Sequence, residues 1–130
     1  MAEQKPDSQP SLDAGDARID DLLAGVAGHA WRLSRLARRA IEKLAPQDGA
    51  RLNNQLRFTD RKLFEELEGV GIRIVDVEGQ VFDPGMPVTA LNADDFSPSD
   101  SLAIDQMIEP IVVGTSGVLK YGVVMLGKIG

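Results

Sequence analysis

The pattern of this chain changes at residues 71–84, which read Gly-Ile-Arg-Ile-Val-Asp-Val-Glu-Gly-Gln-Val-Phe-Asp-Pro. The β-branched residues up to Val77 largely alternate with polar ones, as in a strand with one buried face. Gly79 predicts a turn, and Asp83–Pro84 ends the short strand that follows. Residues before this stretch have helical spacing and those after it have strand-like patterns, so the sequence predicts an α+β fold.

The helical half is dominated by one row of apolar residues. From residue 19 to residue 44 they recur at steps of three and four, which is the a/d spacing of a coiled-coil seam. The row is too long for one small domain and is rich in alanine, so we expect close helix–helix packing between two chains. The predicted dimerisation residues are Ile19, Leu23, Val26, Ala30, Leu33, Ala37, Ala40 and Leu44.

A second helix is predicted over residues 51–68, after a turn at residues 46–49. Its apolar residues are Leu52, Leu56, Leu63 and Leu67. Two amphipathic helices alone bury their apolar faces poorly, whereas hairpins from two chains form a four-helix bundle. Residues 18–68 are therefore predicted to be a dimerisation hairpin that forms a dimeric bundle or coiled coil. Residues 1–17, which are polar and contain two prolines, are predicted to be a disordered tail.

Residues 69–130 are predicted to form a small antiparallel β domain. Pro110 interrupts the strand expected over residues 102–113, so this strand should lie at an edge or contain a bulge. Residues 114–117, Gly-Thr-Ser-Gly, predict a hairpin turn that leads into the last strand at residues 118–129.

The composition excludes several classes of function. The net charge of −6 argues against a general binder of nucleic acids or anionic membranes. The lack of cysteine removes disulfides, thiolate nucleophiles and Cys-based zinc sites. No apolar run approaches the roughly 20 residues that a membrane helix needs. We therefore expect a cytoplasmic protein that has no nucleic-acid or membrane partner and no metal or cofactor.

The polar residues offer no catalytic arrangement. His29, the only histidine, has no second histidine one turn away, so helix-surface packing explains it better than catalysis. The acids between residues 73 and 120 lack the spacing of a calcium loop and are interpreted as surface.

A basic patch is formed by Arg32, Arg35, Arg38 and Arg39. We interpret this patch as a helix flank that faces acids of the tail or of a partner, and the alternative is a phosphate or membrane contact. The chain is expected to be a binding or scaffold protein and not an enzyme.

Residues 71–84 resemble the start of the β domain in the GrpE family, the nucleotide exchange factors of DnaK-type Hsp70 chaperones. The family pattern is of the kind Gly-Val-x-x-Ile-x-x-x-Gly-x-x-Phe-Asp-Pro. The matching positions here include Gly71, Gly79, Phe82, Asp83 and Pro84. The order of elements is also similar, with a helix that runs into the pattern, a polar loop and two further strands after it.

The resemblance implies a homodimer whose helices form a paired stalk and a four-helix bundle. It also implies a β domain that binds the ATPase domain of an Hsp70/DnaK-type partner and opens its nucleotide cleft, so that ADP leaves faster. Carried over by position, the partner-binding residues are Phe82, Pro84, Met86, Ile108, Val118, Lys120, Val124 and Leu126.

The chain departs from the family pattern: the predicted stalk helix before Pro46 is short, and Pro110–Ile111 stands where Gly-Tyr or Gly-Trp is usual before the final hairpin. Pro87 stands where a histidine is usual, and Val118 stands where the last hairpin usually carries an arginine. The alternative is a dimeric scaffold or adaptor whose β domain binds another protein without exchange activity.

Overall fold

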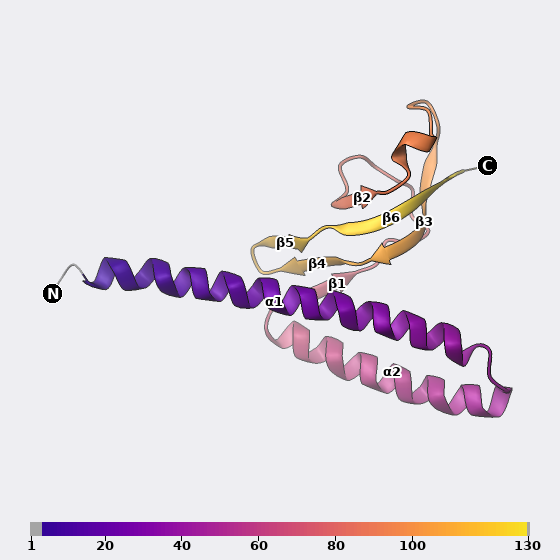
Figure 1. Cartoon of the computed structure of the whole chain (residues 1–130), viewed down its shortest axis with the longest axis horizontal. Coiled ribbons are helices and arrows are strands. Elements are labelled where there is room, and N and C mark those ends of the chain that lie inside the picture. Colours follow the sequence, from indigo (N-terminus) through magenta and orange to yellow (C-terminus); the bar gives the residue numbers. More distant parts are fainter. Residues whose placement is uncertain (1–3, 130) are drawn as a thin grey trace.

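The computed structural model describes the backbone of residues 4–129 and the side chains of residues 17–129. Two helices precede a set of short strands, so the predicted α+β class is confirmed (Figure 1). The helices are α1 (Gln4–Ile41) and α2 (Pro46–Gly69). The strands are β1 (Arg73–Val75), β2 (Val88–Ala90), β3 (Leu102–Glu109), β4 (Ile111–Gly114), β5 (Gly117–Lys120) and β6 (Gly122–Lys128). A 3₁₀ turn at Ala93–Asp95 lies between β2 and β3.

The strands form two three-stranded sheets, with the orders β1-β4-β5 and β2-β6-β3. A single long hairpin supplies most of both sheets, since β3 pairs with β6 and β4 pairs with β5, both antiparallel. The outgoing arm changes sheet at Pro110 and the returning arm changes at Tyr121. The break at Pro110 was predicted, because proline cannot donate to a ladder. The break at Tyr121 and the parallel pairing of β2 with β6 were not predicted.

The predicted turns lie where the backbone requires glycine. Gly79 has a φ of 88° and Gly117 has a φ of 128°, in the region that residues with a Cβ rarely adopt. Gly117 pairs with Gly114 across the turn Thr115–Ser116, so the hairpin turn predicted over residues 114–117 is confirmed.

Helix α1 lies between α2 and the sheets, as Figure 1 shows, and extends at its N-terminal end beyond both. Two fully buried alanines, Ala24 and Ala27, pack in one cluster with Leu67 of α2 and Val112 of β4. One turn further along α1, Trp31 packs in a second cluster with Val77, Ile104, Met107 and residues of β6. Alanine at the first site lets the helix approach the sheet closely, and the larger tryptophan fills the space over β3.

This packing of α1 on its own sheet was not predicted. The face it uses is distinct from the predicted seam, because Ala24, Ala27 and Trp31 centre about 120° around the helix from the seam row and about 150° from Leu33. None of the eight predicted seam residues is buried within the chain, and Ile19, Val26 and Leu33 are more than half exposed.

The helix boundaries differ from the prediction at both ends of α1. Residues 4–17 were predicted to belong to a disordered tail, whereas the structure places them in α1. A helix that is already formed grows at the cost of one residue per hydrogen bond, so it extends into sequence that would not nucleate alone. Residues 1–3 lie outside the described part of the chain.

The connection between the helices comes earlier than predicted. Helix α1 ends at Ile41, and α2 begins at Pro46, which occupies its first turn. Proline suits that position, because its fixed φ is helical and its missing N–H would have no partner there. Leu44, predicted as the last seam residue, therefore lies in the connecting turn.

Candidate protein-binding surface

The turn after residue 82 is built around one half-buried ring and one carboxylate. The N–H of Phe82 donates to the carbonyl of Leu102 at 2.8 Å, and the ring packs on the core under β3 and β6. The carboxylate of Asp83 accepts a hydrogen bond from the N–H of Gly85 at 3.0 Å and closes the turn. Phe82 therefore fixes the base of the turn, and Pro84 is exposed at its tip.

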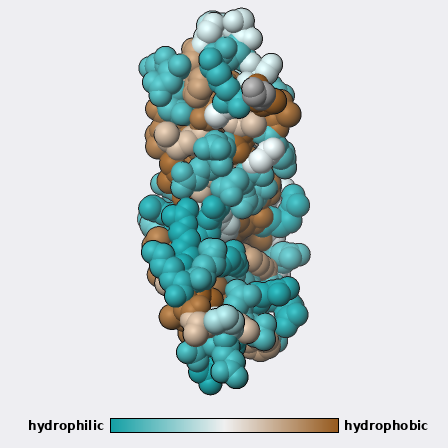
Figure 2. Space-filling model, turned by 90° about the vertical axis from the view of Figure 1, so that its right-hand side faces the viewer, coloured by the Kyte–Doolittle hydropathy of each residue, from teal (hydrophilic) through white to brown (hydrophobic). Residues whose placement is uncertain are grey.

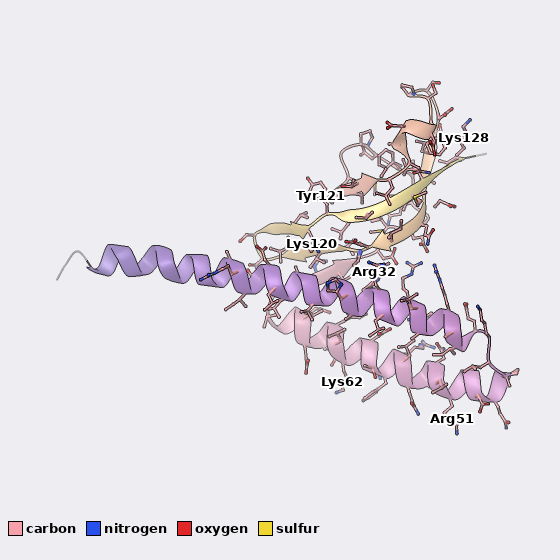
Figure 3. All side chains as sticks on the ribbon, in the orientation of Figure 1. Arg32, Arg51, Lys62, Lys120, Tyr121 and Lys128 are labelled. Carbon is pink, nitrogen blue, oxygen red and sulfur yellow. The ribbon has the colours of Figure 1, made fainter. Side chains whose placement is uncertain are left out.

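This turn lies beside the point where β5 passes into β6. The N–H of Gly122 donates to the carbonyl of Pro87 at 3.0 Å, and Val88 pairs with Gly122 in the parallel ladder. Tyr121, the residue before this contact, is 61% exposed. Figure 3 shows Lys120 and Tyr121 next to each other at the end of β5. The structure thus places Pro87, at the end of the 82–87 turn, beside Gly122, the residue that follows the 118–121 segment.

The eight residues inferred from the resemblance divide into three groups. Exposed to solvent are Pro84, Val118 and Lys120. Half-buried are Phe82, Met86 and Ile108, and of these Ile108 lies apart, in a groove between α1 and β3. Buried are Val124 and Leu126, so their prediction as partner-facing residues is corrected.

The burial of Val124 and Leu126 follows from the alternation of side chains along β6. These two residues point into the core between the sheets, where they pack with Ile104 and Met107. Their neighbours Val123 and Met125 are half-buried on the opposite face. A one-residue error in face assignment therefore exchanges a core residue for a surface residue.

Three exposed apolar residues were missed. Tyr121, Val81 and Leu91 are each more than 60% exposed. Tyr121 could have been found in the sequence, since it is the only tyrosine and lies between a lysine and a glycine within an apolar strand pattern. Nothing local distinguishes Val81 and Leu91 from residues of a buried strand.

Polar contacts join α1 to the β sheets. The guanidinium of Arg35 lies over the ring of Trp31, with 4.7 Å from its Cζ to the ring centroid. The same guanidinium donates to both carboxylate oxygens of Glu78, at 3.0 and 3.3 Å. A hydrogen bond from the backbone N–H of Met107, together with the one from Arg35, holds the pKa of Glu78 below its ordinary value.

A second set of polar contacts joins the two helices. Asp60 of α2 accepts hydrogen bonds from the hydroxyl of Ser34 at 2.7 Å and from the guanidinium of Arg38 at 3.1 Å. Two of the four arginines in the predicted basic patch therefore face acids, as expected for a helix flank. Those acids belong to the same chain and not to the tail or to a partner. Figure 2, which views the molecule from its right-hand side in Figure 1, shows hydrophilic side chains over much of that face with apolar ones between them.

The described residues contain no arrangement that suggests a reaction centre. No group of three or more His, Asp or Glu side chains between residues 17 and 129 is placed to hold a metal ion. His29 is exposed on α1.

A cleft of about 300 Å³ between α1, α2 and β1 is lined mainly by apolar residues, including Trp31, Phe64 and Ile72. In the part of the chain that the structure describes, neither helix has the length and apolar content needed to cross a membrane.

Comparisons of this chain with protein-family models, with curated proteins and with solved structures give no match.

Proposed function

We propose that this chain is a homodimeric exchange factor of the GrpE type, which binds the ATPase domain of an Hsp70/DnaK-type chaperone and promotes release of ADP. The observation that carries the proposal is that the chain exposes two separate surfaces suited to two different contacts. One is the apolar seam of α1, and the other is the surface formed by the 82–87 turn and the 118–121 segment.

The seam supports a homodimer. Ile19, Val26 and Leu33 repeat along one side of α1 and are exposed in the single chain. Helix α1 has 38 residues, which corresponds to a length of about 57 Å at 1.5 Å per residue. The apolar row occupies residues 19–40 of this helix, about 32 Å at 1.5 Å per residue, and a stable dimer, which typically buries about 1,600 Å² in total, would use this row together with α2. The four-helix bundle is the arrangement we propose for the two hairpins.

The second surface supports protein binding. Tyr121 and Val118 supply apolar area, Lys120 supplies a cation, and Pro84 adds a rigid tip. An exposed aromatic beside a cation and a tight turn is the composition of many interface hot spots. An exchange factor needs no catalytic group, because it accelerates release by binding the open conformation of the ATPase more tightly than the closed one. This role would be carried out in the cytoplasm, with the chaperone.

A second candidate function is a dimeric adaptor that binds another protein through the same surface without exchange activity. It is favoured by the burial of Val124 and Leu126, which removes two of the eight contacts that the GrpE resemblance implies. The departures at Pro87 and Val118 lie at the same surface.

Release of a fluorescent ADP analogue from a purified Hsp70-type ATPase of the same organism tests the proposal. The wild-type chain should raise the release rate at least tenfold. The double variant Lys120→Ala/Tyr121→Ala should lose most of this acceleration, whereas Lys62→Ala/Phe58→Ala, which makes similar truncations on exposed positions of α2, should keep it. A stable complex with the ATPase that does not accelerate release would favour the adaptor. Failure to bind any such ATPase would contradict the exchange function.

A further inference from the structure

The four arginines of the basic patch have two different environments. Arg35 is paired with Glu78 and Arg38 is paired with Asp60. Arg32 and Arg39 are exposed, and none of the ion pairs formed between the side chains of residues 17–129 includes either of them. Asp60, Asp76 and Glu78 thus compensate the charges of Arg35 and Arg38, and Arg32 and Arg39 are the members of the patch that form no such pair among the described residues.

Arg32 and Arg39 line the same groove. The groove has a volume of about 110 Å³ and runs between α1 and β3. Leu36 lies between the two arginines on α1, and Ile108 and Gln106 of β3 form the opposite wall. Figure 3 shows Arg32 at the side of α1 that passes under the strands. Leu36 is 59% exposed, so the groove combines the guanidinium groups of Arg32, Arg35 and Arg39 with an apolar strip, and no acidic side chain of the described residues lines it.

The spacing of the two cations limits what can occupy the groove. Residues seven apart on a helix lie on the same side, with Cα atoms separated by about 10.5 Å along the axis. In a polyproline II segment, residues three apart lie on the same side and are separated by about 9.3 Å. Two acidic residues with two others between them therefore match Arg32 and Arg39 in both direction and distance, and an apolar residue between them can contact Leu36 and Ile108.

We propose that the groove between α1 and β3 binds an extended acidic peptide segment of a partner protein, with two carboxylates three residues apart that pair with Arg32 and Arg39. Arg35 also lines this groove, and Glu78 links its two walls by accepting hydrogen bonds from Arg35 of α1 and from the N–H of Met107 in β3. The apolar strip favours a peptide over inorganic phosphate, which would gain nothing from Leu36 and Ile108. This site is separate from the surface proposed for exchange, so the inference stands or fails independently of that function.

The probe is the fluorescein-labelled peptide Pro-Glu-Leu-Pro-Glu-Pro, titrated with the full chain and followed by fluorescence anisotropy. The matched control peptide replaces both glutamates by glutamine. We expect the acidic peptide to bind at least tenfold more tightly, and its affinity to fall several-fold between 50 and 300 mM salt, as ion pairing at an exposed site requires. The emission of Trp31, the only tryptophan, should change on binding because its ring lines the groove.

Two double variants that remove the same charge test whether the peptide binds in this groove. Arg32→Gln/Arg39→Gln should weaken binding of the acidic peptide about tenfold, and Arg57→Gln/Lys62→Gln, which removes the same charge from α2, should change it less than twofold. Both pairs are exposed, and far-UV circular dichroism should show that both variants remain folded. Equal binding of the glutamine peptide, equal loss in the two variants, or equally effective competition by inorganic phosphate would each overturn the proposal.

Discussion

The carboxylate of Glu78 accepts a hydrogen bond from the backbone N–H of Met107 at 2.8 Å. Met107 lies in β3, whose earlier residues pair on this side with the backbone around Gly79 and Gln80. The side chain of Glu78 thus accepts the next hydrogen bond from β3, at the point where the backbone of residues 79 and 80 no longer pairs with that strand. Because the same carboxylate also accepts from Arg35 of α1, this one residue joins the helix layer to the sheet.

Replacement of Glu78 by glutamine should lower the stability of the chain at neutral pH by about 1 kcal/mol, since the amide keeps an acceptor for Met107 but loses the charge that Arg35 binds. The pKa of Glu78 is lowered in the folded state, so its ionised form contributes stability above the ordinary glutamate pKa of about 4.3. This contribution is lost as the pH falls through the lowered pKa. Urea unfolding at pH 7 and at pH 3 should therefore show a larger difference in stability between wild type and Glu78→Gln at pH 7 than at pH 3.

Arg35, Arg39 and Asp76 are the charged groups that face Glu78, and none is changed in this variant. As a control, Glu65→Gln on the exposed side of α2 should change the stability at pH 7 by less than about 0.5 kcal/mol. A difference between wild type and Glu78→Gln that persists undiminished at pH 3 would show that ionisation of Glu78 is not its source.

Replacement of Leu33 by aspartate should dissociate the proposed homodimer. Leu33 is 67% exposed in the single chain, so the change should leave the fold of each chain intact. In a helix–helix seam it would bury an unpaired carboxylate, and a penalty of about 3 kcal/mol raises the dissociation constant roughly 100-fold. Sedimentation equilibrium measures this directly. Leu91→Asp makes the same change at a similarly exposed leucine of the β domain and should leave the dimer intact, and a monomeric wild-type chain would refute the seam.

Two glycine-to-alanine changes should have opposite effects on stability. A Cβ at Gly122 would lie 2.7 Å from the terminal carbon of Met107 and 3.1 Å from the carbonyl oxygen of Glu109. Gly122→Ala should therefore cost about 1–3 kcal/mol through overpacking. A Cβ at Gly28 of α1 would meet no atom within 4 Å, so Gly28→Ala should stabilise the helix by about 1 kcal/mol. Thermal unfolding of the two variants distinguishes them, and a stabilised Gly122→Ala would mean that β3 and β6 are less closely packed than described.

In the last hairpin, a substitution in the core should lower stability, and a substitution at the surface should weaken partner binding. Val124→Ala removes a fully buried side chain and should cost about 2 kcal/mol or more. Lys120→Ala, at an exposed position of β5, should change the free energy of unfolding by less than about 0.5 kcal/mol but weaken binding of the proposed partner. Pull-down and urea unfolding of both variants provide the comparison. If Val124→Ala weakened binding without loss of stability, Val124 would contact the partner after all.

The apolar row from Ile19 to Leu44 shows which features of the helix its periodicity could predict. It identified a helix correctly, and the chain's own fold leaves the predicted seam face of that helix unburied, so its use as a dimer seam stays a prediction. The buried stripe of Ala24, Ala27 and Trp31 was not assigned to the core of the chain, because alanines occur on both faces and their spacing is equally regular. Only the position of the sheet beside α1 makes one alanine stripe part of the core.

The sequence by itself determined the features that depend on local backbone geometry: the helical half, the turns at Gly79 and at residues 114–117, and the strand break at Pro110. Glycine and proline restrict φ and hydrogen bonding at their own positions, so no distant residue is needed to set these features. The tertiary structure alone decided which face of β6 enters the core, where α1 packs, and that Arg35 binds Glu78 across a sequence separation of 43 residues. These outcomes depend on strand register and on contacts between distant segments, which local residue patterns do not encode.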